Sequence, residues 1–304
     1  MVGVKKINLI ELDKVVQLLD ISQSDLDSSK LLLDSNQYPN AVSTFQQSVE
    51  KTVKALALMN KILKFRELKD RIGHNPSKMY IENTENHLQK AKNLKKNIEN
   101  FPQLLELPSI RDLEIDAYIS EVKSAKEMLE GIYNGDKIFS DDINELEGAI
   151  SDMNNVIEEA KNKDMEKITK EGVDEFKQAY IENVKAYIRI SEAQGNILSE
   201  EEKEANLNIS DDIVKDITGN LYKNFILIGT TQALNHTLSL LIMPHFYFVR
   251  YPDKKNPLEY YNDKNPLIIK FEELLKIQEE NLNFHKEYLE IIKKYYKNKI
   301  KIEK

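Results

Sequence analysis

The chain has 304 residues with nine glycines, eight prolines and 31% charged residues, a composition that favours long helices over a turn-rich β fold and predicts an all-α protein. It contains no cysteine, which excludes disulfide bonds, thiolate metal sites and a cysteine nucleophile. Its formal net charge of -8 excludes a surface that is basic all over, although it allows a local basic cleft.

The N-terminal segment predicts a first helix over residues 8–34. Its core candidates are Leu12, Val15, Val16, Leu19, Leu26 and Leu33. The polar run SQSD at Ser22–Asp25 is a point at which this helix can break. The acidic Glu11 and the lack of a long apolar run argue against a secretory signal, so we expect a cytoplasmic protein.

A second helix is predicted from Pro39, whose fixed φ and missing N–H suit a first helical position. Apolar residues then recur at steps of four and three, which places them on one core-facing side of the helix: Ala41, Phe45, Val49, Val53 and Leu56. Polar residues flank this stripe and are placed to meet a partner helix: Gln46, Gln47, Glu50, Lys51 and Lys54.

A third helix is predicted from Pro76 to about Asn100, because the apolar rhythm is lost near Phe65 and restarts after Gly73. Asn75 can cap this helix, and Pro76 can occupy its first position. His74 therefore lies at the junction where a helix begins.

The middle of the chain is expected to form a separate helical part. A helix is predicted from Ser109 to Tyr133, and residues 140–208 are dense in charge, with apolar residues spaced as in an amphipathic helix. We expect residues 84–208 to be a helical insertion that could bind a protein partner. Residues 7–83 plus 209–301 would then form an up-down helical bundle.

Residues 225–249 contain no Asp, Glu, Lys or Arg and are long enough to cross a bilayer. Polar and helix-breaking residues interrupt this run: Gln232, Asn235, His236, Pro244 and His245. Polar side chains are costly in lipid, so we predict a buried central helix and no membrane association.

Two segments resemble the HEPN domain family. The runs AVSTFQQSVEKTVKAL and GHNPSKMY, at 41–56 and 73–80, are similar to the family's Q-x-x-x-E-K-x-x-K-A helix and to the histidine that opens its next helix. Downstream, HFYFVRYPD at His245–Asp253 resembles the arginine-tyrosine-proline segment that ends the family's fourth helix. The resemblance implies a HEPN-like bundle and leaves the middle of the chain unmatched.

In RNA-cleaving HEPN proteins, four to six residues separate an arginine from a histidine, and the pairs of two protomers meet in a dimer cleft. This sequence departs from that pattern, since seven residues separate Arg66 from His74 and two separate Arg71 from His74. The favoured hypothesis is a non-catalytic member that dimerises and binds RNA, a nucleotide or a protein partner in a toxin-antitoxin or antiviral defence setting. The alternative is a metal-independent ribonuclease with His74 and Arg71 as catalytic residues. A third interpretation is that His74 only stabilises the helix junction.

The candidate binding residues are Asn75, Arg250 and Tyr251. If the third and fourth helices are antiparallel neighbours, the start of one and the end of the other lie at the same pole of the bundle. We therefore expect these residues to lie near Arg71 and His74, where the helix dipole adds positive potential. Arg250 could instead tie the bundle's end together through a nearby aspartate.

No pattern in the sequence predicts a cofactor or a metal site. His236 and His245 are nine residues apart, which does not place them on one helical turn, and His87 and His285 are isolated among charged neighbours. The lysines and tyrosines of residues 286–304 could bind RNA or could simply complement the dipole of the last helix. The long apolar stripes of the second and last helices predict a homodimer.

Overall fold

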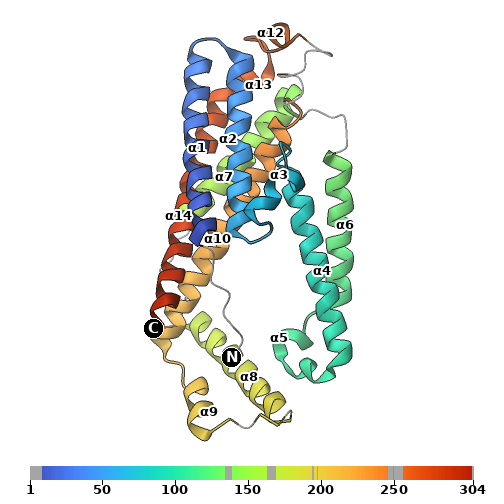
Figure 1. Cartoon of the computed structure of the whole chain (residues 1–304), viewed down its shortest axis with the longest axis vertical. Coiled ribbons are helices and arrows are strands. Elements are labelled where there is room, and N and C mark those ends of the chain that lie inside the picture. The colour runs from blue at the N-terminus through green and yellow to red at the C-terminus, as the bar shows by residue number, and fades with distance from the viewer. Residues whose placement is uncertain are drawn as a thin grey trace. The chain divides into compact units, whose positions relative to one another are not determined.

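The structure is a computed structural model, and it describes residues 9–133, 139–162, 169–193, 195–196, 198–245, 249 and 256–302. Every regular element in these ranges is a helix, which confirms the predicted all-α class (Figure 1). Contacts between residues divide the chain into two compact units. Unit 1 comprises residues 1–83, 128–162 and 226–304, and unit 2 comprises residues 84–127 and 163–225.

Unit 1 is a helical bundle. Its elements are α1 (Leu9–Asp34), α2 (Tyr38–Met59), η1 (Phe65–Glu67), α3 (Leu68–Arg71), the start of α4 (Lys78–Asn100), the end of α6 (Ile115–Tyr133), η3 (Phe139–Asp141), α7 (Ile143–Asn162), the second half of α10 (Asp211–Ile242), α12 (Pro257–Tyr260), α13 (Pro266–Ile269) and α14 (Phe271–Ile302). The first two helices form a hairpin, α14 packs against both of them, and α7 packs against α14 and α13 (Figure 1).

The hairpin between α1 and α2 turns at Asn36, which has a positive φ of 57°. The amide of Gln37 bonds the carbonyl of Leu32 at 2.8 Å, and the amide of Asn36 bonds that of Leu33 at 2.9 Å. This is the closing pattern of a helix that ends on a left-handed residue. Asparagine suits that position because its short polar side chain tolerates left-handed backbone better than most residues do.

The predicted stripe of α2 forms the centre of the bundle. All five residues, Ala41, Phe45, Val49, Val53 and Leu56, are completely buried. The ring of Phe45 meets that of Phe271 on α14 edge-on, with centroids 5.2 Å apart. The stripe is therefore used within the chain itself, and it leaves no apolar face of α2 for a second copy.

The helix break considered at Ser22–Asp25 is absent, because α1 continues through it. Ser22 is buried, and its hydroxyl bonds the carbonyl of Ser48 at 2.8 Å, while Asp25 accepts a 2.6 Å bond from Lys51. Polar side chains that would compete with the backbone in an isolated helix are thus engaged by α2.

Helix α7 lies in unit 1, whereas the sequence placed it in the expected insertion. Its apolar stripe, Leu146, Ile150, Met153 and Ile157, is buried in the main core. Lys161 on this helix also bonds Glu280 of α14 at 2.7 Å. The high charge of this segment favoured an insertion in the sequence analysis. The charged residues occupy only the solvated side of the amphipathic helix, and the other side packs in the core of unit 1.

A chain of buried polar side chains runs between four helices of unit 1. Gln278 of α14 donates to Ser48 and Thr52 of α2, and Ser48 also bonds Ser22 of α1. On the other side, Asn281 of α14 donates to Gln278 of the same helix and to Asn235 of α10. His285 completes the network through a 3.1 Å contact with the Asn235 amide and a 2.8 Å bond to the carbonyl of Asn281.

Helix α10 is, within the described ranges, the one helix long and apolar enough to cross a membrane by length and composition. Of its most apolar window, 56% is buried inside the protein. Leu234, Leu238, Leu241 and Ile242 belong to the core of unit 1. This half of the helix therefore has the environment of a core helix.

Unit 2 contains most of α4 and α6, η2 (Pro102–Glu106), α5 (Pro108–Arg111), α8 (Lys170–Ala193), α9 (Glu200–Leu207) and the first half of α10. Ion pairs Lys95–Asp116 and Lys126–Glu85 connect α4 to α6. A small apolar cluster of Val173, Ile209 and Val214 joins α8 to the start of α10. The single helix predicted from Ser109 to Tyr133 is in fact α5 and α6, with a turn between them.

Candidate functional site

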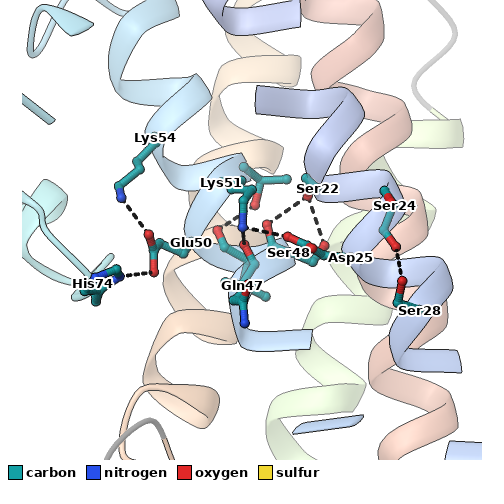
Figure 2. Close-up of polar contacts among 12 residues, drawn as sticks. Ser22, Ser24, Asp25, Ser28, Gln47, Ser48, Glu50, Lys51, Lys54 and His74 are labelled. Carbon is teal, nitrogen blue, oxygen red and sulfur yellow. Dashed lines mark hydrogen bonds and ion pairs between the residues drawn. The ribbon is translucent and has the colours of Figure 1, made fainter. Parts of the chain in front are cut away.

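The predicted histidine is held by a buried carboxylate of α2. Nδ1 of His74 lies 3.2 Å from one oxygen of Glu50, and the other oxygen accepts a 2.6 Å bond from Lys54 one turn further along (Figure 2). The Glu50 side chain is only 8% exposed, whereas that of His74 is 65% exposed. Glu50 thus brings an ammonium group and an imidazole to the same place at the edge of the bundle core.

Local sequence explains how His74 reaches Glu50. Leu68 and Ile72 are buried and fix α3 onto the bundle, and Gly73 then turns the chain with a φ of 59°. Asn75 accepts a 3.0 Å bond from the amide of Ser77, so it caps the turn that leads into α4, as the sequence predicted. His74 therefore lies between two anchored segments.

The arginine nearest to His74 in sequence is bound to a different carboxylate. The Arg71 guanidinium makes two contacts with Glu82 of α4, with Nη2 at 2.5 Å and Nε at 3.1 Å from its two oxygens. This two-pronged pair is the strongest geometry available to arginine. Arg71 and His74 are each tied to a separate acid, and no bond joins them to one another among the contacts described here.

The other two predicted binding residues, Arg250 and Tyr251, lie outside the described residues. The expected meeting of these residues with His74 at one pole of the bundle stays a prediction. Of the downstream motif, the structure describes only His245 and Val249; Val249 packs against the core, and His245 belongs to a different site.

His245 belongs to a second polar cluster in unit 1. Its Nε2 lies 2.5 Å from the Ser140 hydroxyl and its Nδ1 lies 2.8 Å from the Tyr261 hydroxyl, while Tyr260 bonds Asp141. Burial raises the pKa of both tyrosines, so their hydroxyls keep their protons. Ser140, His245 and Tyr261 are almost entirely buried, so this serine–histidine pair ties η3, α10 and α12 together rather than meeting a substrate.

The remaining histidines fit structural roles. His236 packs edge-on against Tyr80 at 4.8 Å, and burial lowers its pKa. His285 is completely buried in the polar network although charged residues surround it in the sequence. In the part of the chain that the structure describes, no group of three or more His, Cys, Asp or Glu side chains could hold a metal ion.

Sequence reasoning missed the partners of His74. It noted Glu50 and Lys54 only as polar residues beside the apolar stripe. The spacing of four between them was a usable signal, since residues four apart on a helix are neighbours and a glutamate pairs well with a following lysine. The pairing of Glu50 with a residue 24 positions later had no local signal.

A family model described as the HEPN domain matches residues 15–215. This range covers about two thirds of the chain, includes His74 and its partners, and spans the segment 84–208 that was expected to be an insertion. It ends before the downstream segment His245–Asp253. Comparison with curated proteins and with solved structures gives no match.

Proposed function

Because this chain belongs to the HEPN domain family, we propose that it binds a phosphate group of RNA or of a nucleotide beside His74 without cleaving it. The proposal assigns binding to Lys54 and His74, with Asn75, Arg250 and Tyr251 as further candidates. The family points to a nucleotide-binding or ribonuclease-like role, and we place this member in a cytoplasmic toxin-antitoxin or antiviral defence system.

The observation that carries the proposal is the separation of the arginine from the histidine. RNA-cleaving relatives use an arginine and a histidine together, whereas here Glu82 holds Arg71 and Glu50 holds His74. Arg71 has its charge balanced by Glu82 through Nε and Nη2, and among the described contacts it forms no bond with His74, so the two do not act as the arginine–histidine pair of those relatives. Binding without cleavage is the function that this arrangement supports best.

Glu50 also positions two groups that can donate hydrogen bonds to a phosphate. An ammonium group has three donors, and Lys54 uses one of them for Glu50. A protonated imidazole donates from both nitrogens, so His74 can bond Glu50 through Nδ1 and a phosphate oxygen through Nε2.

The test is a binding titration with labelled single-stranded RNA and with ATP. His74→Ala and Lys54→Gln should each weaken binding roughly tenfold, as expected for the loss of one charge-assisted bond. His87→Ala is the matched control, since His87 is another exposed histidine, and it should bind normally. Equal affinities for all these variants would reject the site.

A second candidate function is a metal-independent endoribonuclease that uses His74. One observation favours it: Nδ1 of His74 lies 3.2 Å from an oxygen of Glu50. If Nδ1 donates to that oxygen, Nε2 is the nitrogen of the neutral ring that can accept a proton. That nitrogen could accept the proton of a 2′-hydroxyl as it attacks the adjacent phosphate. Cleavage of total RNA in the presence of EDTA, lost in His74→Ala, would establish this function in place of simple binding.

We also propose a homodimer and a protein partner. The homodimer rests on the family alone, because the apolar stripes of α2 and α14 that predicted it lie in the core of the chain itself. The predicted insertion is the proposed region for a protein partner, and large apolar side chains exposed in unit 2 support this: Phe101, Leu105 and Tyr187.

A further inference from the structure

The connector between α2 and α4 concentrates positive charge on an acidic protein. Residues 61–78 contain six lysines and arginines but only two acids, Glu67 and Asp70, a net charge of +4, whereas the whole chain carries -8. Such a contrast places a local field of opposite sign on one part of the surface. The connector is therefore a candidate site for an anionic ligand.

The connector is anchored to the bundle, so its charges are displayed at fixed positions. Leu63 and Leu68 are buried in the main core, while Lys64, Phe65, Arg66 and Lys69 between and after them are exposed. Residues 65–71 form one short helical run made of η1 and α3. Phe65 and Lys69 are four residues apart on this run and so lie on the same side.

An exposed aromatic ring lies among these cations. Phe65 is 44% exposed, and Nζ of Lys14, on α1, lies 5.3 Å from the centroid of its ring. A cation at this distance is held by the electron density of the ring face. We call Lys14, Lys64, Phe65, Arg66 and Lys69 the connector patch.

The charges of the connector patch are not neutralised as those of the His74 site are. Within the described ranges, the side chains of Lys64, Arg66 and Lys69 form no ion pair, unlike Lys54 and Arg71. The connector itself contains two acids, Asp70 and Glu67, and Glu67 accepts a 2.8 Å bond from the amide of Lys64. Against six lysines and arginines, they leave the connector with a net positive charge.

We propose that the connector patch binds single-stranded RNA, with its lysines and arginine on the phosphates and Phe65 stacked on a base. This inference rests on the proposed function and names its ligand as an RNA strand rather than a free nucleotide. A positive surface with an interleaved aromatic ring is the combination that binds single strands without sequence preference. The base faces of a duplex are covered by stacking, so a duplex could use the charges but not Phe65.

The experiment measures fluorescence anisotropy of a labelled oligouridylate of about 12 nucleotides with the full chain over a range of salt concentrations. Phe65→Ala should weaken binding roughly 5- to 100-fold, and Phe65→Tyr should restore it, since both rings stack. The double variant Arg66→Gln and Lys69→Gln should lower the slope of log affinity against log salt by about 1.4, at about 0.7 per phosphate contact.

A matched control removes charge elsewhere on unit 1. Lys276→Gln changes an exposed lysine of α14. The part of α14 that meets the start of the connector is at Tyr288, which bonds Asn60, and Lys276 is more than three helical turns away from it. Its affinity and salt slope should equal those of the natural chain. A blunt-ended RNA duplex with as many phosphates should lose little affinity in Phe65→Ala, because its stacked bases leave no face for the ring.

The outcomes separate this inference from the proposed function. If the natural chain binds neither RNA nor ATP, both fail. If His74→Ala weakens binding and the Phe65 and Arg66/Lys69 variants do not, the function stands and the connector patch is overturned. Equal loss in Phe65→Ala for the single strand and the duplex would also overturn it. Thermal unfolding of each variant shows whether it is folded.

Discussion

The burial of His285 predicts a pH dependence of stability that can be worked out in advance. In the folded protein its Nε2 accepts from the Asn235 amide and its Nδ1 donates to the carbonyl of Asn281, so both nitrogens of the neutral ring are bonded. Burial opposes protonation more strongly than the backbone bonds with Asn281 and Thr52 favour it. Removal from water lowers the pKa of His285 from its ordinary value of 6.5 to about 4. The side chain is completely buried, so solvent does not screen this effect.

The sign follows from which state binds the proton. Between pH 6.5 and about 4, the unfolded chain carries a proton on this ring and the folded chain does not, so lowering the pH favours unfolding. One pKa unit corresponds to about 1.4 kcal/mol, which gives a total loss of about 3 kcal/mol once the pH is below both values. Between about pH 7.5 and 5 the loss should be about 2 kcal/mol. Burial also lowers the pKa of His236, which adds to the loss in the same direction.

The assay is urea unfolding followed by circular dichroism at several pH values across this range. His285→Gln keeps an oxygen that can accept from Asn235, but its side chain does not titrate. The slope of its unfolding free energy against pH should therefore be smaller, by at most the contribution of one proton. His87→Gln, which changes an exposed histidine, should keep the full dependence. Stability of the natural chain that does not change between about pH 7.5 and 5, or an unchanged slope in His285→Gln, would refute the reasoning.

Four further predictions follow from the geometry. Glu50→Gln should lower the free energy of unfolding by about 1–3 kcal/mol, because Lys54 loses its partner in a nearly buried ion pair. Glu279→Gln, which removes the exposed ion pair with Lys30, should change it by less than about 0.5 kcal/mol. Asn36→Val should cost about 1–2 kcal/mol in the left-handed turn, while Asn36→Gly stays within about 0.5 kcal/mol; an equal effect of both would contradict the role given to backbone conformation. Hydrogen exchange should be faster in α8 and α9 than in α2 and α14, since unit 2 has the smaller core, and uniform protection would count against this. Light scattering at micromolar concentration should give twice the chain mass, and a mass of 35.3 kDa would reject the homodimer.

The sequence predicted the parts of the fold that periodicity controls. The stripe from Ala41 to Leu56 lies in the core as expected, because a spacing of three and four leaves only one way to bury it. The break considered at Ser22–Asp25 does not occur, because Ser22 and Asp25 are engaged by residues of α2 that lie 26 positions away. Local propensity cannot register such a contact.

The candidate site was predicted only in part. His74 and Asn75 were placed correctly at the junction before α4, since glycine, asparagine and proline mark a helix start by local chemistry. The pairing of His74 with Glu50 and that of Arg71 with Glu82 depend on how α2, α3 and α4 come together. The connector patch depends on which side chains of residues 61–78 are anchored in the core. The ion pairs and the connector patch both result from the packing of distant segments, which no short stretch of sequence predicts.

The buried polar network limits how unit 1 can move. A slide of α14 by one turn relative to α2, about 5.4 Å, would carry Gln278 away from Ser48 and Thr52. It would also strand buried amides that have no water to replace the lost bonds. Apolar side chains could repack after such a step, but the hydrogen bonds of the network form in only one alignment of the two helices. The polar network therefore fixes the alignment of α14 with α2. We expect a conformational response to a ligand to change the loops at the surface of unit 1 and to leave this alignment unchanged.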